Sequence, residues 1–157
     1  AIARLRDRTG VARVALVCHS MGGLAARAYL RDCVAAGVDP GVASVITLGT
    51  PHRGTHVAWL GLGENARQMQ PDSAWLQALA SPAPLLDTRV IYSPHDNFVM
   101  PQSQLQLPGV PNQAIDGIGH LAMLFSPRVA QALLAALREA QPEALWDLHN
   151  NPGHNPL

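Results

Sequence analysis

The sequence contains no lysine, and all 11 of its basic residues are arginines. They are scattered along the chain, apart from a small group at Arg4, Arg6 and Arg8, and 11 acidic residues balance their charge. A nucleic-acid-binding domain instead carries a basic stripe, or basic residues interleaved with aromatic ones. The composition therefore argues against nucleic acid as a partner.

Cysteines and long apolar runs are also scarce. The two cysteines, Cys18 and Cys33, are separated by a mostly helical segment of roughly 20 Å, which is too far for a disulfide. No run of 18 or more apolar residues occurs, so the sequence predicts no transmembrane helix. These absences do not assign a compartment: cytoplasmic, secreted and cell-envelope locations stay open, as does the oligomeric state.

Apolar runs alternating with helical patterns predict an α/β fold. Such a fold has a parallel sheet with flanking helices and right-handed crossovers. The arginine-led run Arg13–Cys18 is continuously apolar after its first residue, which is typical of a strand buried on both faces. The strands are expected at Arg13–Cys18, Val42–Leu48, Arg89–Tyr92 and Asn112–Ile115, and helices at Ile2–Arg8, Met21–Ala36 and after the Ser126-Pro127 cap, where Val129, Leu133, Leu134 and Leu137 share one face.

One domain is predicted over residues 1–140, with an insert and a tail. The insert, His56–Pro84, is largely irregular and holds a short helix near Ser73–Ala80. The tail, residues 141–157, contains three prolines and several asparagines and is expected to be flexible.

The segment His19-Ser20-Met21-Gly22-Gly23 links a predicted strand directly to a predicted helix. In such a turn the serine adopts a strained backbone conformation that raises its hydroxyl above the sheet, at the positive end of the helix. Cys18 stands where the G-x-S-x-G pattern has its first glycine, and cysteine is still small. We therefore predict that Ser20 is a nucleophile.

Two further polar residues follow the carboxyl ends of predicted strands, as Ser20 does. Asp96 follows Arg89–Tyr92, and His120 follows Asn112–Ile115 in a glycine-flanked loop. Because function gathers at this edge of a parallel sheet, His120 is the predicted base and Asp96 its acid partner. Asp116 is the second candidate for the acid.

An acyl-transfer site also needs hydrogen-bond donors for the oxyanion. The Met21 N–H, directly after the nucleophile, is one expected donor. The second donor ordinarily lies on a loop after an earlier strand, which this sequence does not contain. His52 and His56 have a spacing that can suit a metal, but no carboxylates lie near them in the sequence, so no metal and no cofactor is predicted.

Four segments together resemble the α/β-hydrolase superfamily, and within it the bacterial serine lipases and esterases. They are Val14–Gly23, Thr47–Thr55 (TLGTPHRGT), Tyr92–Pro101 (YSPHDNFVMP) and Gly117–Leu121 (GIGHL). The resemblance implies the same roles for Ser20, Asp96, His120 and Met21. It also implies that the insert at about 56–84 is a lid over the acyl site, lined by Trp59, Leu60, Leu62, Trp75 and Leu76.

In a complete domain of this fold the serine follows a later strand, whereas here it follows the first one predicted. We therefore expect the carboxyl-terminal part of an α/β-hydrolase fold that lacks its amino-terminal strands, with Val14–Val17 at the open edge of the sheet. The implied function is hydrolysis of a carboxylic ester or lipid through an acyl-serine intermediate. An acyltransferase with the same triad and a non-catalytic remnant are the alternatives, and activity of these 157 residues alone is left open.

Overall fold

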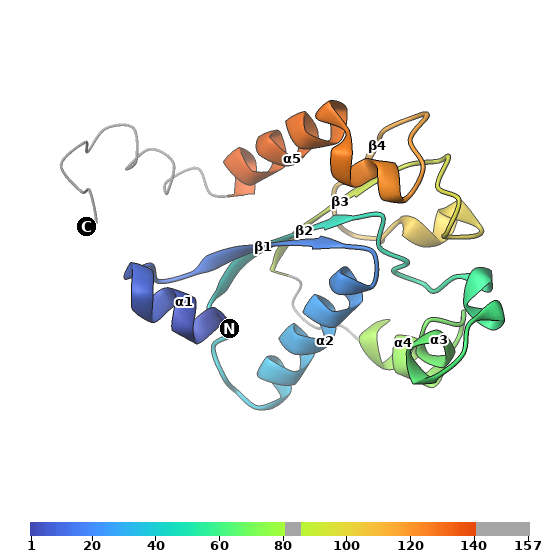
Figure 1. The fold of residues 1–157 in the computed structure, drawn as a ribbon. Helices are drawn as coiled ribbons and strands as arrows, with labels where there is room; N and C mark the ends of the chain where they lie inside the picture. The colour runs from blue at the N-terminus through green and yellow to red at the C-terminus, as the bar shows by residue number, and fades with distance from the viewer. Residues whose placement is uncertain (81–85, 141–157) are drawn as a thin grey trace.

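The computed structural model describes residues 1–80 and 86–140 of the chain. Four parallel strands form one sheet in the order β1-β2-β3-β4, and helices cover both of its faces (Figure 1). The α/β class predicted from the sequence is therefore confirmed. The elements in chain order are α1 (Ile2–Thr9), β1 (Val14–His19), α2 (Met21–Ala35), β2 (Val42–Leu48), η1 (His56–Leu60), α3 (Glu64–Gln68), α4 (Ala74–Ala80), β3 (Asp87–Tyr92), η2 (Gln102–Leu105), β4 (Asn112–Ala114), η3 (Leu121–Phe125) and α5 (Pro127–Ala140).

The core lies in two layers, one on each face of the sheet. On one face, α5 packs against β2 and β3 through a cluster that includes Ile46, Ile91 and Val129. On the other face, α2 packs against β1 and β2 around Leu30 and Val45. This burial of apolar surface on both faces is what a parallel sheet requires, and it holds the carboxyl ends of the strands in fixed relative positions.

The first strand is less buried than its sequence predicts. Within the described part of the chain β1 pairs only with β2, so it lies at one edge of the sheet, as expected. Its residues are half-buried, and the Val17 side chain is 46% exposed. The prediction of a strand buried on both faces was therefore wrong for β1. An apolar run shows that the strand is hydrophobic, but not that another strand or helix covers it.

The last helix buries a slightly different face from the one predicted. Val129, Ala132 and Ala136 are buried, and Leu133 and Leu137 pack beside them. Leu134 is exposed, contrary to prediction. At 100° per residue it lies about 140° around the helix from Val129, so it cannot share that face.

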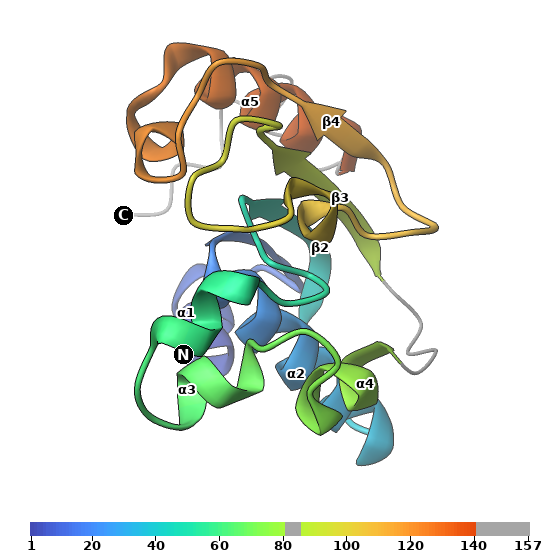
Figure 2. The ribbon, with the colours of Figure 1, turned by 90° about the vertical axis from the view of Figure 1, so that its right-hand side faces the viewer.

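The insert contains more regular structure than predicted. The expected short helix corresponds to α4, but η1 and α3 were missed because each spans only five residues. At that length a helical periodicity is too short to detect. α3 and α4 lie beside α2, on the same side of the sheet (Figure 2). The predicted end of the insert and the predicted flexible tail lie outside the described residues.

Candidate active site

Ser20 stands alone between the last residue of β1 and the first of α2. Its backbone has φ 55° and ψ −130°, a combination that non-glycine residues rarely adopt. Two hydrogen bonds stabilise this conformation: the Ser20 N–H donates to the Leu48 carbonyl at 2.8 Å, and the Thr50 hydroxyl donates to the Ser20 carbonyl at 2.8 Å. The strained serine predicted from the sequence is therefore present, and it is held by the last residue of β2 and by the loop that follows.

The glycines after Ser20 have different surroundings. A Cβ on Gly23 would lie 2.2 Å from the Thr50 hydroxyl oxygen, whereas one on Gly22 would lie 3.8 Å from the Cβ of Cys18. Only Gly23 thus sits where a side chain cannot fit without a shift. The contact at Gly22 is an ordinary one, which is consistent with a cysteine at the position where the pattern usually has glycine.

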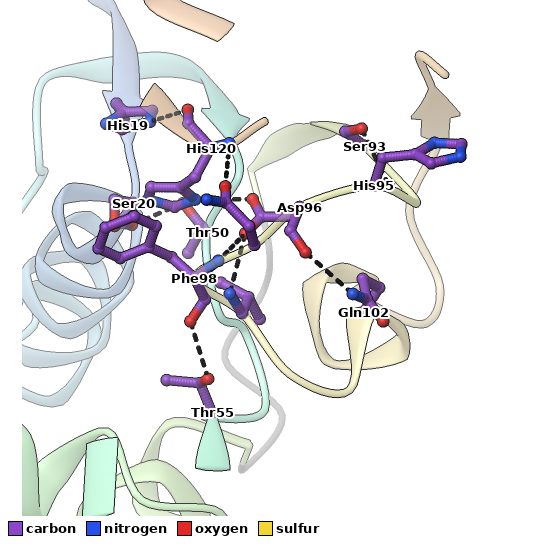
Figure 3. Close-up of polar contacts among 12 residues, drawn as sticks. His19, Ser20, Thr50, Thr55, Ser93, His95, Asp96, Phe98, Gln102 and His120 are labelled. Carbon is purple, nitrogen blue, oxygen red and sulfur yellow. Dashed lines mark hydrogen bonds and ion pairs between the residues drawn. The ribbon is translucent and has the colours of Figure 1, made fainter. Parts of the chain in front are cut away.

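A continuous line of hydrogen bonds joins Ser20, His120 and Asp96 (Figure 3). The Ser20 Oγ lies 2.9 Å from His120 Nε2, and His120 Nδ1 lies 2.6 Å from Asp96 Oδ2. Both His120 and Asp96 are buried, with 3% and 1% of their surface exposed. The structure thus brings together the three residues that the sequence placed beyond the ends of separate strands.

The Asp96 carboxylate is stabilised in its charged form. Burial pushes its pKa upward, but the hydrogen bond with His120 and the backbone N–H groups of Phe98 and Val99 outweigh this effect, and the pKa is lowered. Both N–H groups donate to Oδ1 at 2.8 Å, which leaves Oδ2 for His120. An ionised Asp96 favours the His120 tautomer with its proton on Nδ1, which leaves Nε2 facing the Ser20 hydroxyl as an acceptor.

The second candidate for the acid lies elsewhere. Asp116 is exposed, and its backbone carbonyl accepts a hydrogen bond from Arg128. Its short distance from His120 along the chain does not bring its carboxylate to the imidazole, since Nδ1 of His120 faces Asp96.

Several residues around His120 were not predicted. The Asn97 side chain accepts the His120 N–H at 3.0 Å, and the Phe98 ring stacks on the imidazole with 5.2 Å between centroids. Gly49 lies beneath, where a Cβ would come within 3.3 Å of His120 Nδ1. The run His95-Asp96-Asn97-Phe98 was visible in the sequence, but only the tertiary structure shows that its second, third and fourth residues all contact His120.

The remaining described histidines fall into different environments. His19 lies against His120, with its Nε2 3.2 Å from the His120 carbonyl oxygen. His52 is buried, and burial together with the nearby Arg27 guanidinium lowers its pKa from 6.5 to about 3. His56 stacks on Trp59, and His95 accepts the Gly117 N–H. His149 and His154 lie outside the described residues.

Met21, the expected oxyanion donor, follows Ser20 directly. Met21 is the first residue of α2, where backbone N–H groups lack partners within the helix and the helix dipole is positive. Its N–H remains the expected oxyanion donor beside Ser20.

A hollow of about 200 Å³ opens beside Ser20 and His120. Its walls are mostly apolar and come from the loop after β2, the insert and the segment after β3; besides Ser20 and His120 they comprise Pro51, Thr55, Val57, Ala58, Gly61, Ala66, Met69, Phe98 and Val99. Among the described residues, those lining the hollow contribute no carboxylate and no guanidinium group.

The five residues expected to line the acyl site do not border this hollow. Leu60 and Leu62 are 87% and 98% exposed, and Trp59 is also exposed. Leu76 is buried in a cluster with Leu24 and Leu79, where Trp75 packs as well. Other residues of the same insert form the wall instead: the small residues Ala58, Gly61 and Ala66, together with Val57 and Met69.

The described residues include no group of three or more metal-ligating side chains. No helix in the described part of the chain is long and apolar enough to cross a membrane.

A family model described as palmitoyl protein thioesterase matches residues 2–103 of the chain. Among solved structures, the chain is similar to the mature form of lipase BlEst2 from Bacillus licheniformis, with TM-score 0.65 and 17% identity over 88% of this chain and 69% of that one. It is also similar to a gene product of Listeria innocua, with TM-score 0.60 and 18% identity over 87% of this chain and 62% of that one. A third similar structure is an α/β-hydrolase enzyme from the metagenome of lagoon sediments at Mar Chica, Morocco, with TM-score 0.57 and 18% identity over 90% of this chain and 68% of that one.

At these identities the similarity to solved structures shows the fold alone, and it is the predicted α/β-hydrolase fold. The chain spans 62% to 69% of the length of these three structures.

Proposed function

The chain belongs to the palmitoyl protein thioesterase family, within the α/β-hydrolase superfamily, and we propose that it hydrolyses an ester or thioester of an apolar acyl group through an acyl-serine intermediate on Ser20. The observation that carries this proposal is the line from Ser20 to His120 to Asp96, with contacts of 2.9 Å and 2.6 Å, which starts at a serine with φ 55°. A strained serine in contact with a buried imidazole–carboxylate pair has no evident structural purpose, whereas acyl transfer requires that arrangement.

In the first half of the proposed reaction, Ser20 Oγ attacks the acyl carbonyl carbon as its proton passes to His120 Nε2. The imidazolium formed in this step is stabilised by the Asp96 carboxylate at Nδ1. The negative charge that develops on the carbonyl oxygen is stabilised by the Met21 N–H and the positive end of α2. Collapse of this intermediate breaks the bond to the leaving group, which takes the proton from His120 and departs as an alcohol or thiol.

In the second half, water replaces the leaving group. His120 accepts a proton from water, the hydroxide attacks the acyl-serine carbonyl, and the Ser20 oxygen recovers its proton as the carboxylic acid leaves. Transfer of the acyl group to an alcohol would use the same groups, but no feature of the described residues favours an alcohol over water as the acceptor.

The hollow beside Ser20 supports an apolar acyl group. A dry protein cavity of about 150 Å³ accepts a benzene molecule, so a hollow of about 200 Å³ has room beside Ser20 for roughly six carbons or more. Ala58, Gly61 and Ala66 bring part of the wall from the insert, and Gly61 and Ala66 are so close that a Cβ on Gly61 would lie 2.8 Å from that of Ala66. We therefore propose an apolar acyl chain as the group transferred, bound between the insert and the loop after β3.

The test is covalent labelling of the purified chain with an alkyl fluorophosphonate, followed by mass spectrometry. The probe should modify Ser20, and Ser20→Ala should abolish labelling and lower kcat on p-nitrophenyl esters by roughly 10³-fold or more. Parallel assays with p-nitrophenyl hexanoate and with a hexanoyl thioester distinguish the two ester classes. Ser73→Ala is a matched control, because Ser73 caps α4 away from His120. Equal labelling of the Ser20→Ala variant would exclude Ser20 as the nucleophile.

A further inference from the structure

We propose that His19 is a positioning residue for the reaction: its imidazole holds the backbone of His120 so that the His120 ring stays in line with Ser20. The inference rests on the proposed function, since it assigns His19 a role in moving the proton of Ser20. His19 is the last residue of β1, and Ser20 follows it directly. Two adjacent residues therefore supply the proposed nucleophile, Ser20, and a contact to the backbone of the proposed base, His120.

Each polar atom of His120 has a hydrogen-bond partner in another residue. Its ring nitrogens contact Ser20 and Asp96, at 2.9 Å and 2.6 Å, and its N–H donates to Asn97 at 3.0 Å. The remaining group is the backbone carbonyl, and His19 Nε2 lies 3.2 Å from its oxygen (Figure 3). Asn97 and Asp96 both belong to the segment after β3, so His19 is the contact that ties the backbone of the His120 loop to the element bearing Ser20.

The two imidazoles also touch each other. Their centroids are 4.7 Å apart with 48° between their planes, while Phe98 lies against the His120 ring at 5.2 Å. The His120 ring thus has aromatic neighbours from two different elements, the end of β1 and the loop after β3. Contacts with both elements restrict the rotation of the imidazole about its side-chain bonds, which would otherwise move Nε2 away from Ser20.

The charge state of His19 suits this role. The titratable groups that face it are His120 and Asp96. Burial and the charge of His120 lower the pKa of His19, and together they outweigh the hydrogen bond to the His120 carbonyl and the charge of Asp96, which raise it. A neutral imidazole that donates from Nε2 keeps the carbonyl bonded. It also places no positive charge beside His120 when that residue takes the proton of Ser20 and becomes a cation.

The experiment compares two substitutions of similar shape in the full chain, His19→Gln and His19→Met. Glutamine carries an N–H donor near the position of Nε2 and methionine carries none. Because a displacement of about 1 Å in an active site can cost 10²-fold in rate, His19→Met should lower kcat on p-nitrophenyl hexanoate by roughly 10- to 100-fold. The kcat of His19→Gln should stay within about threefold of the parent value. KM should be unchanged in both variants, since His19 does not line the hollow. His56→Gln, at an exposed histidine outside the hollow, is the matched control.

The outcomes separate the two proposals. If Ser20→Ala abolishes phosphonate labelling but His19→Gln and His19→Met have equal kcat, the role of His19 is refuted and the function stands. If Ser20→Ala is labelled like the parent, the function itself fails. Thermal unfolding is recorded for every variant; should His19→Met not fold, His19→Phe replaces it, which keeps a ring against His120 without the donor and should show the same loss of kcat.

Discussion

Replacement by alanine should have opposite effects on stability at the two glycines after Ser20, Gly22 and Gly23. A methyl group added at Gly23 would meet Thr50, with 2.2 Å to Oγ1 and 2.9 Å to Cβ, whereas one added at Gly22 meets only the Cys18 Cβ at 3.8 Å. Both positions are in α2, where alanine is more favourable than glycine by about 0.5–1 kcal/mol. Gly22→Ala should therefore stabilise the protein by about that amount.

At Gly23 the same helical gain is outweighed. Overpacking of this kind costs about 1–3 kcal/mol. The Thr50 hydroxyl, which donates to the Ser20 carbonyl at 2.8 Å, must also move, and the loss of that bond costs about 0.5–1.5 kcal/mol. The net expectation is that Gly23→Ala lowers the free energy of unfolding by about 0.5–4 kcal/mol. In a protein of this size each kcal/mol corresponds to about 2–4 °C in Tm.

The assay is urea and thermal unfolding of the full chain, followed by circular dichroism. Adding Thr50→Ala to Gly23→Ala removes the two closest contacting atoms and leaves the 2.9 Å contact, so the double variant should recover part of the lost stability. Equal stability of Gly22→Ala and Gly23→Ala would refute the reasoning, because it would mean that α2 and the loop after β2 do not approach as closely as described.

Three further predictions concern the acid, the acyl hollow and the buried histidine. Asp96→Asn should lower kcat by roughly 10³- to 10⁴-fold while Asp116→Asn has little effect, and steady-state kinetics showing the reverse ranking would move the acid to Asp116. Ala66→Leu should reduce the rate on hexanoate relative to acetate by about 10-fold or more; an unchanged chain-length profile would remove Ala66 from the acyl wall. His52 is held neutral by a pKa lowered to about 3, so its contribution to stability is present above pH 6.5 and is lost as pH falls toward 3, at roughly 1.4 kcal/mol per pH unit. In urea titrations at several pH values, the free energy of unfolding of His52→Gln should therefore fall less steeply with decreasing pH. An identical pH slope in the variant and the parent would contradict this.

The local sequence was sufficient for the elements that carry a strong pattern. The run Val42–Leu48 is continuously apolar apart from two small hydroxyl residues, and its predicted bounds match β2. A glycine at position 23 permits the close approach of α2 to the loop after β2, and Ser20 stands between a strand pattern and a helix pattern, so the strained turn was predictable as well. The insert was less predictable, since η1 and α3 are short and their residues lack a long period.

The acyl site shows where reasoning from residue type fails. Large apolar residues of the insert were expected to line it, but Leu62 is almost fully exposed, whereas Leu76 is buried against α2. The residues that do face the hollow, such as Ala58, Gly61 and Ala66, are small and carry no distinctive signal in the sequence. Size and hydrophobicity predict that a side chain is buried somewhere, but not which surface buries it.

The sequence by itself determined the order along the chain of the four strands and of α1, α2, α4 and α5, the turn that strains Ser20, and the placement of Asp96 and His120 beyond the ends of strands. Those features depend on residues that are close to one another in the chain, so their spacing can be read directly from the sequence. Only the tertiary structure decided that Asp96 rather than Asp116 reaches His120, and that His19 contacts the His120 carbonyl across 101 positions of chain. Contacts of that kind depend on the twist and register of the whole sheet, because a shift of one strand by a single residue would redirect every side chain at its end.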